Sequence, residues 1–141
     1  MTSSSTPVSK PPRVVVPALL AVLGIAGMSA VWVIAALVLD RQCAWMAIIA
    51  AFDLALLLRL GRAAPGLQRG IVAVVGTLAT ILIANWTIAA TEIGFPLGLN
   101  LTEAVQRLGP HHAQTLFGLA HHPVDWAYYA IALIVAAWWG R

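Results

Sequence analysis

One carboxylate, Asp53, lies inside an apolar run that extends from Cys43 to Leu58. If this run crosses a bilayer, an acid at its centre costs about 2.5–3.5 kcal/mol on insertion scales, so it should face other helices and find a partner or take up a proton. Asp53 is then either a carboxylate that carries a proton or binds a substrate, or one that fixes packing through an interhelical hydrogen bond. Its depth favours Thr77 as the partner, because Asn85 lies about 12 Å further out at helical rise.

Four histidines stand in two adjacent pairs, His111-His112 and His121-His122. Imidazole binds metals and haem and titrates near neutral pH, so the pairs are candidate ligands for a cofactor or groups that sense pH. Their spacing is poor, because His111 and His122 share a helix face but stand about 16 Å apart in an unbroken helix. Histidines in solvated loops or helix caps are the alternative. We predict no metal site and leave the cofactor open.

Further polar residues, Asn85-Trp86-Thr87 and Glu92, occupy the outer half of the third apolar run. Together with the histidine segment they can form a shared pocket that faces outward. The alternative is ordinary hydrogen bonding between helices, which Asn and Thr commonly provide in membranes. The sequence contains no phosphate-binding glycine loop, nucleophile elbow, HExxH motif or cysteine cluster, and an enzyme is not predicted.

The elements that position these residues follow from composition. The 141 residues are 61% hydrophobic and 9% charged, far more apolar than a soluble domain of average composition. Backbone groups in hydrocarbon must be satisfied within each span, which favours helices. The pattern predicts an all-α membrane protein, an antiparallel bundle of four transmembrane helices that forms one domain over residues 13–141. The predicted spans are residues 14–39, 42–60, 70–92 and 123–140, and residues 1–12 are predicted to be a disordered cytoplasmic tail.

Positive charge sets the predicted orientation. The connection Arg59–Arg69 carries three arginines and no acid, and short basic loops stay in the cytoplasm. With four spans, this side collects six of the eight basic residues, namely Lys10, Arg13, Arg59, Arg62, Arg69 and Arg141. Both termini are therefore predicted to be cytoplasmic, in a bacterial inner membrane. The basic residues surround apolar spans and form no polar face, so nucleic acid is not a predicted partner.

The connection between the third and fourth spans is long and rich in glycine and proline. Asn100 and Glu103 have capping-box spacing, which predicts a short helix over 101–108, and Pro110 can begin a second one through about Ala120. Both are expected to be amphipathic.

Small residues recur at short intervals, mostly three or four positions, in three spans, which permits close helix packing and association with a protein partner or a second copy. They are Gly24, Gly27 and Ser29, then Ala47, Ala51 and Ala55, then Gly76, Thr80 and Ala84. The lone Cys43 is expected to be a buried packing residue.

Two segments, Ala84–Glu92 and Leu108–Leu116, resemble small inner-membrane proteins of proteobacteria that carry a vitamin B12 transport family label. The resemblance implies a role near cobalamin uptake, in which an outer histidine approaches the corrin cobalt. It also implies an assisting role, because the chain is small and has no nucleotide-binding motif. The function we predict is a non-enzymatic accessory or transport-related subunit; the alternative is a carrier or sensor of protons, metal or a tetrapyrrole that uses Asp53 or the histidine pairs.

Overall fold

The computed structural model describes residues 14–109, 111, 114–115, 118 and 121–141, and all regular structure in these residues is helical. The predicted tail, residues 1–12, lies outside them. The elements in chain order are α1 (Val15–Leu39), α2 (Met46–Leu60), α3 (Leu67–Gly94), the 3-10 helix η1 (Phe95–Leu97), α4 (Leu101–Arg107) and α6 (Pro123–Trp139).

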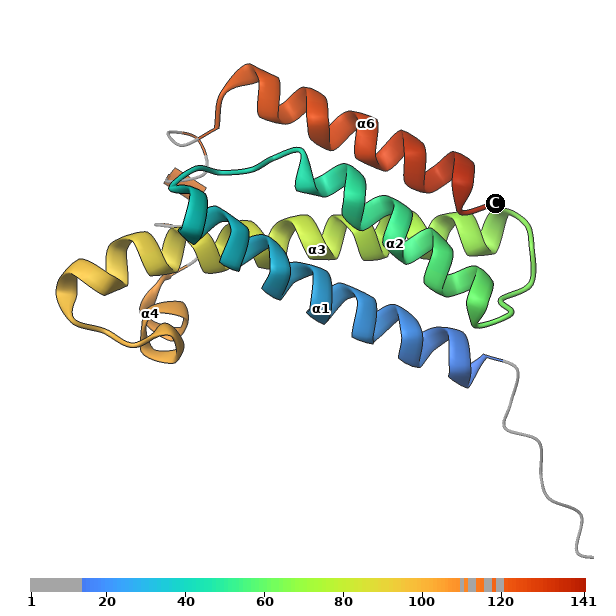
Figure 1. Ribbon diagram of the computed structural model, residues 1–141, viewed down its shortest axis with the longest axis horizontal. Coiled ribbons are helices and arrows are strands. Elements are labelled where there is room, and N and C mark those ends of the chain that lie inside the picture. The colour runs from blue at the N-terminus through green and yellow to red at the C-terminus, as the bar shows by residue number, and fades with distance from the viewer. Residues whose placement is uncertain (1–13, 110, 112–113, 116–117, 119–120) are drawn as a thin grey trace, which may run out of the picture.

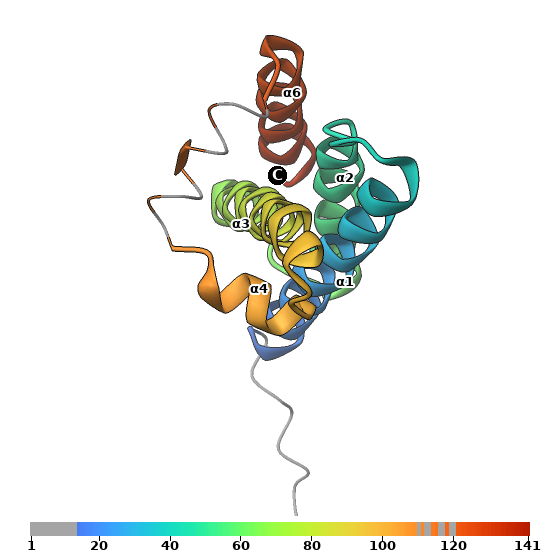
Figure 2. The same ribbon diagram turned by 90° about the vertical axis from the view of Figure 1, so that its left-hand side faces the viewer.

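The four long helices run alternately in opposite directions, as predicted (Figure 1). α2 and α3 contact each other and also both flanking helices, α1 and α6 (Figure 2). α1 and α6 therefore lie on opposite sides of the α2–α3 pair. This order brings residues from the end of α1, the end of α3 and the start of α6 to the same end of the bundle.

The second helix begins later than the sequence suggested. α1 ends at Leu39; its C-cap residue Asp40 takes a left-handed backbone conformation, and Cys43 also has a positive φ of 50°. Gln42, predicted to begin the second span, is instead held in the connection because its carbonyl accepts a hydrogen bond from Trp32 Nε1 at 3.0 Å. The helix over 42–60 is thus reduced to Met46–Leu60.

The third helix is longer than predicted at both ends. Gly66, with φ 133°, ends the α2–α3 connection, and α3 begins at the next residue, Leu67, in place of residue 70. It continues to Gly94, where the predicted span ended at Glu92. The fourth helix, α6, agrees closely with the predicted 123–140.

Helix length separates the four helices into two pairs. α1 and α3, of 25 and 28 residues, are long and apolar enough to cross a membrane. α2 and α6 have 15 and 17 residues, fewer than the roughly 20 that a helical span normally needs. Among the described residues, two helices therefore qualify as candidate spans by length and composition, and the protein is all-helical with a weak indication of membrane association.

Most of the small residues expected at helix contacts are buried inside the bundle. They are Gly24 and Ser29 of α1, Ala47, Ala51 and Ala55 of α2, and Gly76, Thr80 and Ala84 of α3. A Cβ added at Gly76 would lie 2.3 Å from Cδ2 of Leu54, so α3 and α2 approach closely there. Gly27 is the exception, since it is exposed with no atom near its missing Cβ. These faces pack within the chain and, apart from Gly27, are closed to a partner.

The short helix predicted at 101–108 is confirmed as α4. Asn100 Oδ1 accepts a hydrogen bond from Glu103 N at 3.2 Å, and Glu103 Oε2 accepts one from Asn100 N at 3.4 Å. α4 folds back on the end of α3, where a Cβ on Gly94 would lie 2.4 Å from Ala104 Cβ. Most residues of the second short helix, predicted for 110–120, lie outside the described part of the chain.

Candidate functional site

The side chain of Asn85 on α3 is 1% exposed and makes three hydrogen bonds. Its amide nitrogen donates to Ile81 O, one turn earlier, at 2.8 Å. Its carbonyl oxygen accepts from Gln42 Nε2 at 2.6 Å and from Tyr129 Oη at 3.2 Å. Asn85 thus joins α3 to the α1–α2 connection and to α6.

His121, in the segment just before α6, completes the same network. Its Nε2 lies 3.0 Å from Tyr129 Oη and 3.5 Å from Gln42 Nε2. The half-buried imidazole also lies beside two aromatic rings, with centroid distances of 5.9 Å to Trp126 and 5.6 Å to Tyr129. The sequence-predicted proximity of Asn85 to the histidine segment therefore holds for His121.

Trp32 attaches α1 to this group. It is fully buried, donates to Gln42 O, and its ring centroid lies 6.3 Å from that of Tyr129. We call these five residues, Trp32, Gln42, Asn85, His121 and Tyr129, the Asn85 cluster. All its members come from different elements, and its hydrogen bonds fasten α1, α3, α6 and the α1–α2 connection at one end of the bundle.

The other histidines are placed differently. His122 is the N-cap residue of α6, where its backbone N–H donates to Asp125 Oδ2 at 2.8 Å. The carbonyl of His111 accepts from Thr115 Oγ1 at 3.1 Å, and His112 lies outside the described residues. Within the described part of the chain, no three His, Cys, Asp or Glu side chains gather as metal ligands would. His122 thus has the helix-cap role that was the alternative to ligation.

Asp53 does not pair with Thr77, so that expectation is wrong. The Thr77 hydroxyl donates to Ala73 O of its own helix at 2.8 Å, as threonines in apolar helices commonly do. Asp53 is half-buried and points toward α1, where its Oδ2 would lie 3.4 Å from a Cβ added at Gly24. No hydrogen bond or ion pair from a described residue reaches its carboxylate.

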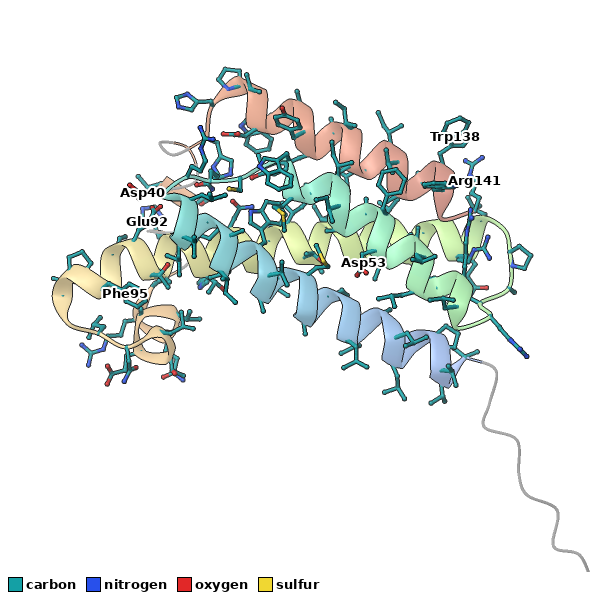
Figure 3. The ribbon with its side chains drawn as sticks, viewed as in Figure 1. Asp40, Asp53, Glu92, Phe95, Trp138 and Arg141 are labelled. Carbon is teal, nitrogen blue, oxygen red and sulfur yellow. The ribbon has the colours of Figure 1, made fainter. Side chains whose placement is uncertain are left out.

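Asp53 and the Asn85 cluster also lie at different levels of the bundle. Figure 3 places Asp53 near the middle, whereas Asp40 and Glu92 mark the end at which Gln42 and His121 are found. On α3, Thr77 lies near the level of Asp53, because the adjacent Gly76 packs against Leu54, and Thr80 lies about one turn nearer to Asn85. The hydroxyls of both threonines donate within α3, to Ala73 O and Gly76 O. The described hydrogen bonds therefore form no chain from the cluster to Asp53.

Two members of the cluster, Gln42 and Tyr129, were not expected from the sequence. Gln42 reads as a turn or span-end residue, and Tyr129 sits within an apolar run. The one signal in the sequence that could have pointed to Tyr129 is its place in an apolar run, because the hydroxyl of a buried tyrosine usually needs a hydrogen-bond partner. Nothing in the spacing of residues 42, 85 and 129 identifies them as neighbours.

Two arginines that flank the α2–α3 connection, Arg59 at the end of α2 and Arg69 at the start of α3, have a structural role at the opposite end of the bundle. Arg59 Nη2 donates to Trp139 O at 2.8 Å and its guanidinium lies 5.7 Å from the centre of the Trp139 ring. Arg69 Nε donates to Gly140 O at 2.7 Å, and its Nη2 donates to Arg141 O. Because the last carbonyls of a helix have no partner within it, these two side chains cap the C-terminus of α6.

Comparisons of the chain with protein-family models, with curated proteins and with solved structures gave no match.

Proposed function

We propose that the chain is a four-span membrane protein that acts as a non-enzymatic accessory subunit, and that its partner covers Asp53 on the surface where α1 meets α2. The observation that carries this proposal is the half-buried carboxylate of Asp53 in the middle of α2, which no described residue pairs. Because Asp53 is only half-buried, part of its side chain remains accessible at the surface of the bundle.

The exposed surface supports placement in a membrane. Large apolar side chains cover the outside of all four long helices, including Leu23 (66% exposed) on α1, Leu56 (55%) on α2, Val75 (60%) on α3 and Ile134 (65%) on α6. Soluble monomers rarely expose contiguous apolar surface on this scale. Hydrocarbon chains solvate it without cost.

The short helices are compatible with four spans. As helices of 15 and 17 residues, α2 and α6 extend about 22 and 26 Å against about 30 Å of hydrocarbon. Local thinning of the bilayer and arginine side chains that reach the interface accommodate a mismatch of this size. Trp45, Trp126 and Trp138, all exposed near helix ends, suit the interfaces.

Asp53 determines what the partner must offer. An unpaired ionised carboxylate within hydrocarbon is costly, and the cost is removed when a donor or a cation from another helix meets it. The small-residue faces once expected to bind a partner are used within the bundle. A partner helix carrying a basic or hydrogen-bonding side chain at mid-membrane is therefore the class of subunit that fits.

The test is site-specific photocrosslinking in native membranes. A crosslinker at Leu56, one turn from Asp53, is expected to capture a single discrete membrane protein, and a crosslinker at Ile134 on α6 is not. Asp53→Leu should abolish the Leu56 adduct, whereas Asp40→Asn, an acid exposed at the end of α1, should leave it intact. An adduct that survives Asp53→Leu in a folded chain contradicts the proposal.

The alternative function, a carrier or sensor of protons, metal or a tetrapyrrole, has less support. A carrier that uses Asp53 and the histidines needs groups that connect them, and the hydroxyls of Thr77 and Thr80 are bonded within α3. The link to vitamin B12 uptake rests on the two resembling segments alone and stays a prediction.

A further inference from the structure

A large cleft opens at the arginine end of the bundle, between the start of α1, the end of α2 and the start of α3. Its volume is about 1070 Å³, at the upper end of the range typical of small-molecule sites. Most of its wall is apolar and includes Val14, Pro17, Leu58 and Val72, while Arg62, Gln68 and Arg69 line the polar part. The cleft is thus amphipathic, with a hydrocarbon-like wall beside cationic groups.

Arg62 is the cation in this cleft that is available to a ligand. It is exposed, its backbone has a φ of 57°, and no hydrogen bond or ion pair joins its guanidinium to a described residue. Arg69 differs, because its nitrogens donate to Gly140 O, Ala63 O and Arg141 O. Arg62 is therefore the cation on which ligand binding depends.

No described acid balances this charge. The described carboxylates other than Asp53 belong to Asp40, Glu92, Glu103 and Asp125, which occur at the ends of helices on the far side of the bundle. Figure 3 shows Asp40 and Glu92 at the end opposite Arg141. The cleft therefore combines apolar walls with an uncompensated positive potential, which complements an anion that carries hydrocarbon chains.

We propose that this cleft binds an anionic glycerophospholipid, with its phosphodiester on the Arg62 guanidinium and an acyl chain along Pro17, Leu58 and Val72. A guanidinium donates two parallel hydrogen bonds to phosphate oxygens, and basic pockets between membrane helices are a recurring form of headgroup site. The apolar walls select a lipid over free phosphate. This inference rests on the membrane placement proposed above and is independent of the partner at Asp53.

The test uses the full chain in nanodiscs that contain phosphatidylcholine and phosphatidylglycerol, followed by native mass spectrometry of the lipids it retains. Wild type is expected to retain phosphatidylglycerol preferentially. Arg62→Gln should lower that preference about fivefold, the factor expected for one interfacial basic residue. Ala18→Trp, which places a large ring in the cleft wall, should lower the amount of retained lipid. Arg107→Gln on α4 is the matched control and should change neither.

The outcomes separate this inference from its alternatives. Soluble glycerol phosphate that displaces the lipid would show that the headgroup alone is the ligand and would overturn the lipid assignment. Equal loss of preference in Arg62→Gln and Arg107→Gln would show a general charge effect and overturn the site. Asp53→Leu should keep the wild-type preference for phosphatidylglycerol. The lipid experiment can therefore be interpreted even if the crosslinking experiment at Asp53 finds no partner.

Discussion

Asn85 connects α3 to two other segments of the bundle, because its side-chain carbonyl oxygen accepts one hydrogen bond from each of them. Both donors, Gln42 Nε2 and Tyr129 Oη, belong to elements far away in the chain. A polar side chain within a membrane bundle stabilises the arrangement of helices in which its partners are present, and opposes those in which they are absent. The Asn85 cluster therefore contributes to the choice of one arrangement.

Replacement of Asn85 should be costly. Asn85→Leu keeps a similar volume but leaves the Gln42 amide and the Tyr129 hydroxyl without their acceptor, and it should lower the free energy of unfolding by about 1–2 kcal/mol. Tyr129→Phe should cost less, because the Gln42 bond remains. Unfolding of the purified protein in detergent measures both. The control is Thr87→Val, whose hydroxyl bonds only to Ile83 O of its own helix, and an equal loss in that variant would contradict the role of the cluster.

At the scale of the element, two helical glycines differ in what surrounds them. Gly76 of α3 lies against Leu54 and Ile25, whereas no atom lies within 4 Å of the position of a Cβ on Gly27. Close helix approach thus depends on the first and not on the second.

Matched substitutions test this difference. Gly76→Leu should separate α3 from α2 and lower the free energy of unfolding by about 1–3 kcal/mol through overpacking. Gly27→Leu should be neutral or stabilising in detergent, because the added side chain faces outward and a helical glycine is replaced by a better helix former. Similar losses in the two variants would mean that Gly27 is buried in an interface between copies.

The C-terminal turn of α6 is a second element-scale feature, since Arg69 donates to its last carbonyls. Arg69→Met should retain the apolar stem and remove those hydrogen bonds. The expected result is faster amide hydrogen exchange over residues 136–141, with exchange at the start of α6 unchanged. Uniform acceleration along the whole of α6 would instead indicate that Arg69 supports the docking of the helix.

At the scale of the whole molecule, the proposed four-span arrangement predicts that the arginine end and both termini lie on one side of the membrane. Cysteines introduced at Arg62 and Arg141 should react with a membrane-impermeant maleimide only after the cells are opened, because both positions are predicted to face the cytoplasm. The native Cys43 is buried and should add little background labelling. A cysteine at Gly98, beyond α3, should react in intact cells. Labelling of residues 98 and 141 from the same side would mean an even number of crossings between them, where the four-span arrangement requires one, and would reject that arrangement.

The sequence by itself determined the helical elements and several of their ends. Continuous apolar runs gave the four long helices, the Asn100–Glu103 spacing gave α4, and small residues at helical spacing gave the faces that pack α2 and α3. These features depend on neighbours within a turn or two, so local chemistry is sufficient to predict them. Cys43 is buried, as expected.

Only the tertiary structure decided which polar groups meet. Helices that are apolar on every side carry little information about which face turns inward, so the rotation of α2 that directs Asp53 toward α1, away from Thr77, could not be read from periodicity. The meeting of Gln42, Asn85 and Tyr129 likewise depends on how α1, α3 and α6 dock. Such contacts depend on the relative rotation and depth of separate helices, and the packing of the whole bundle sets both.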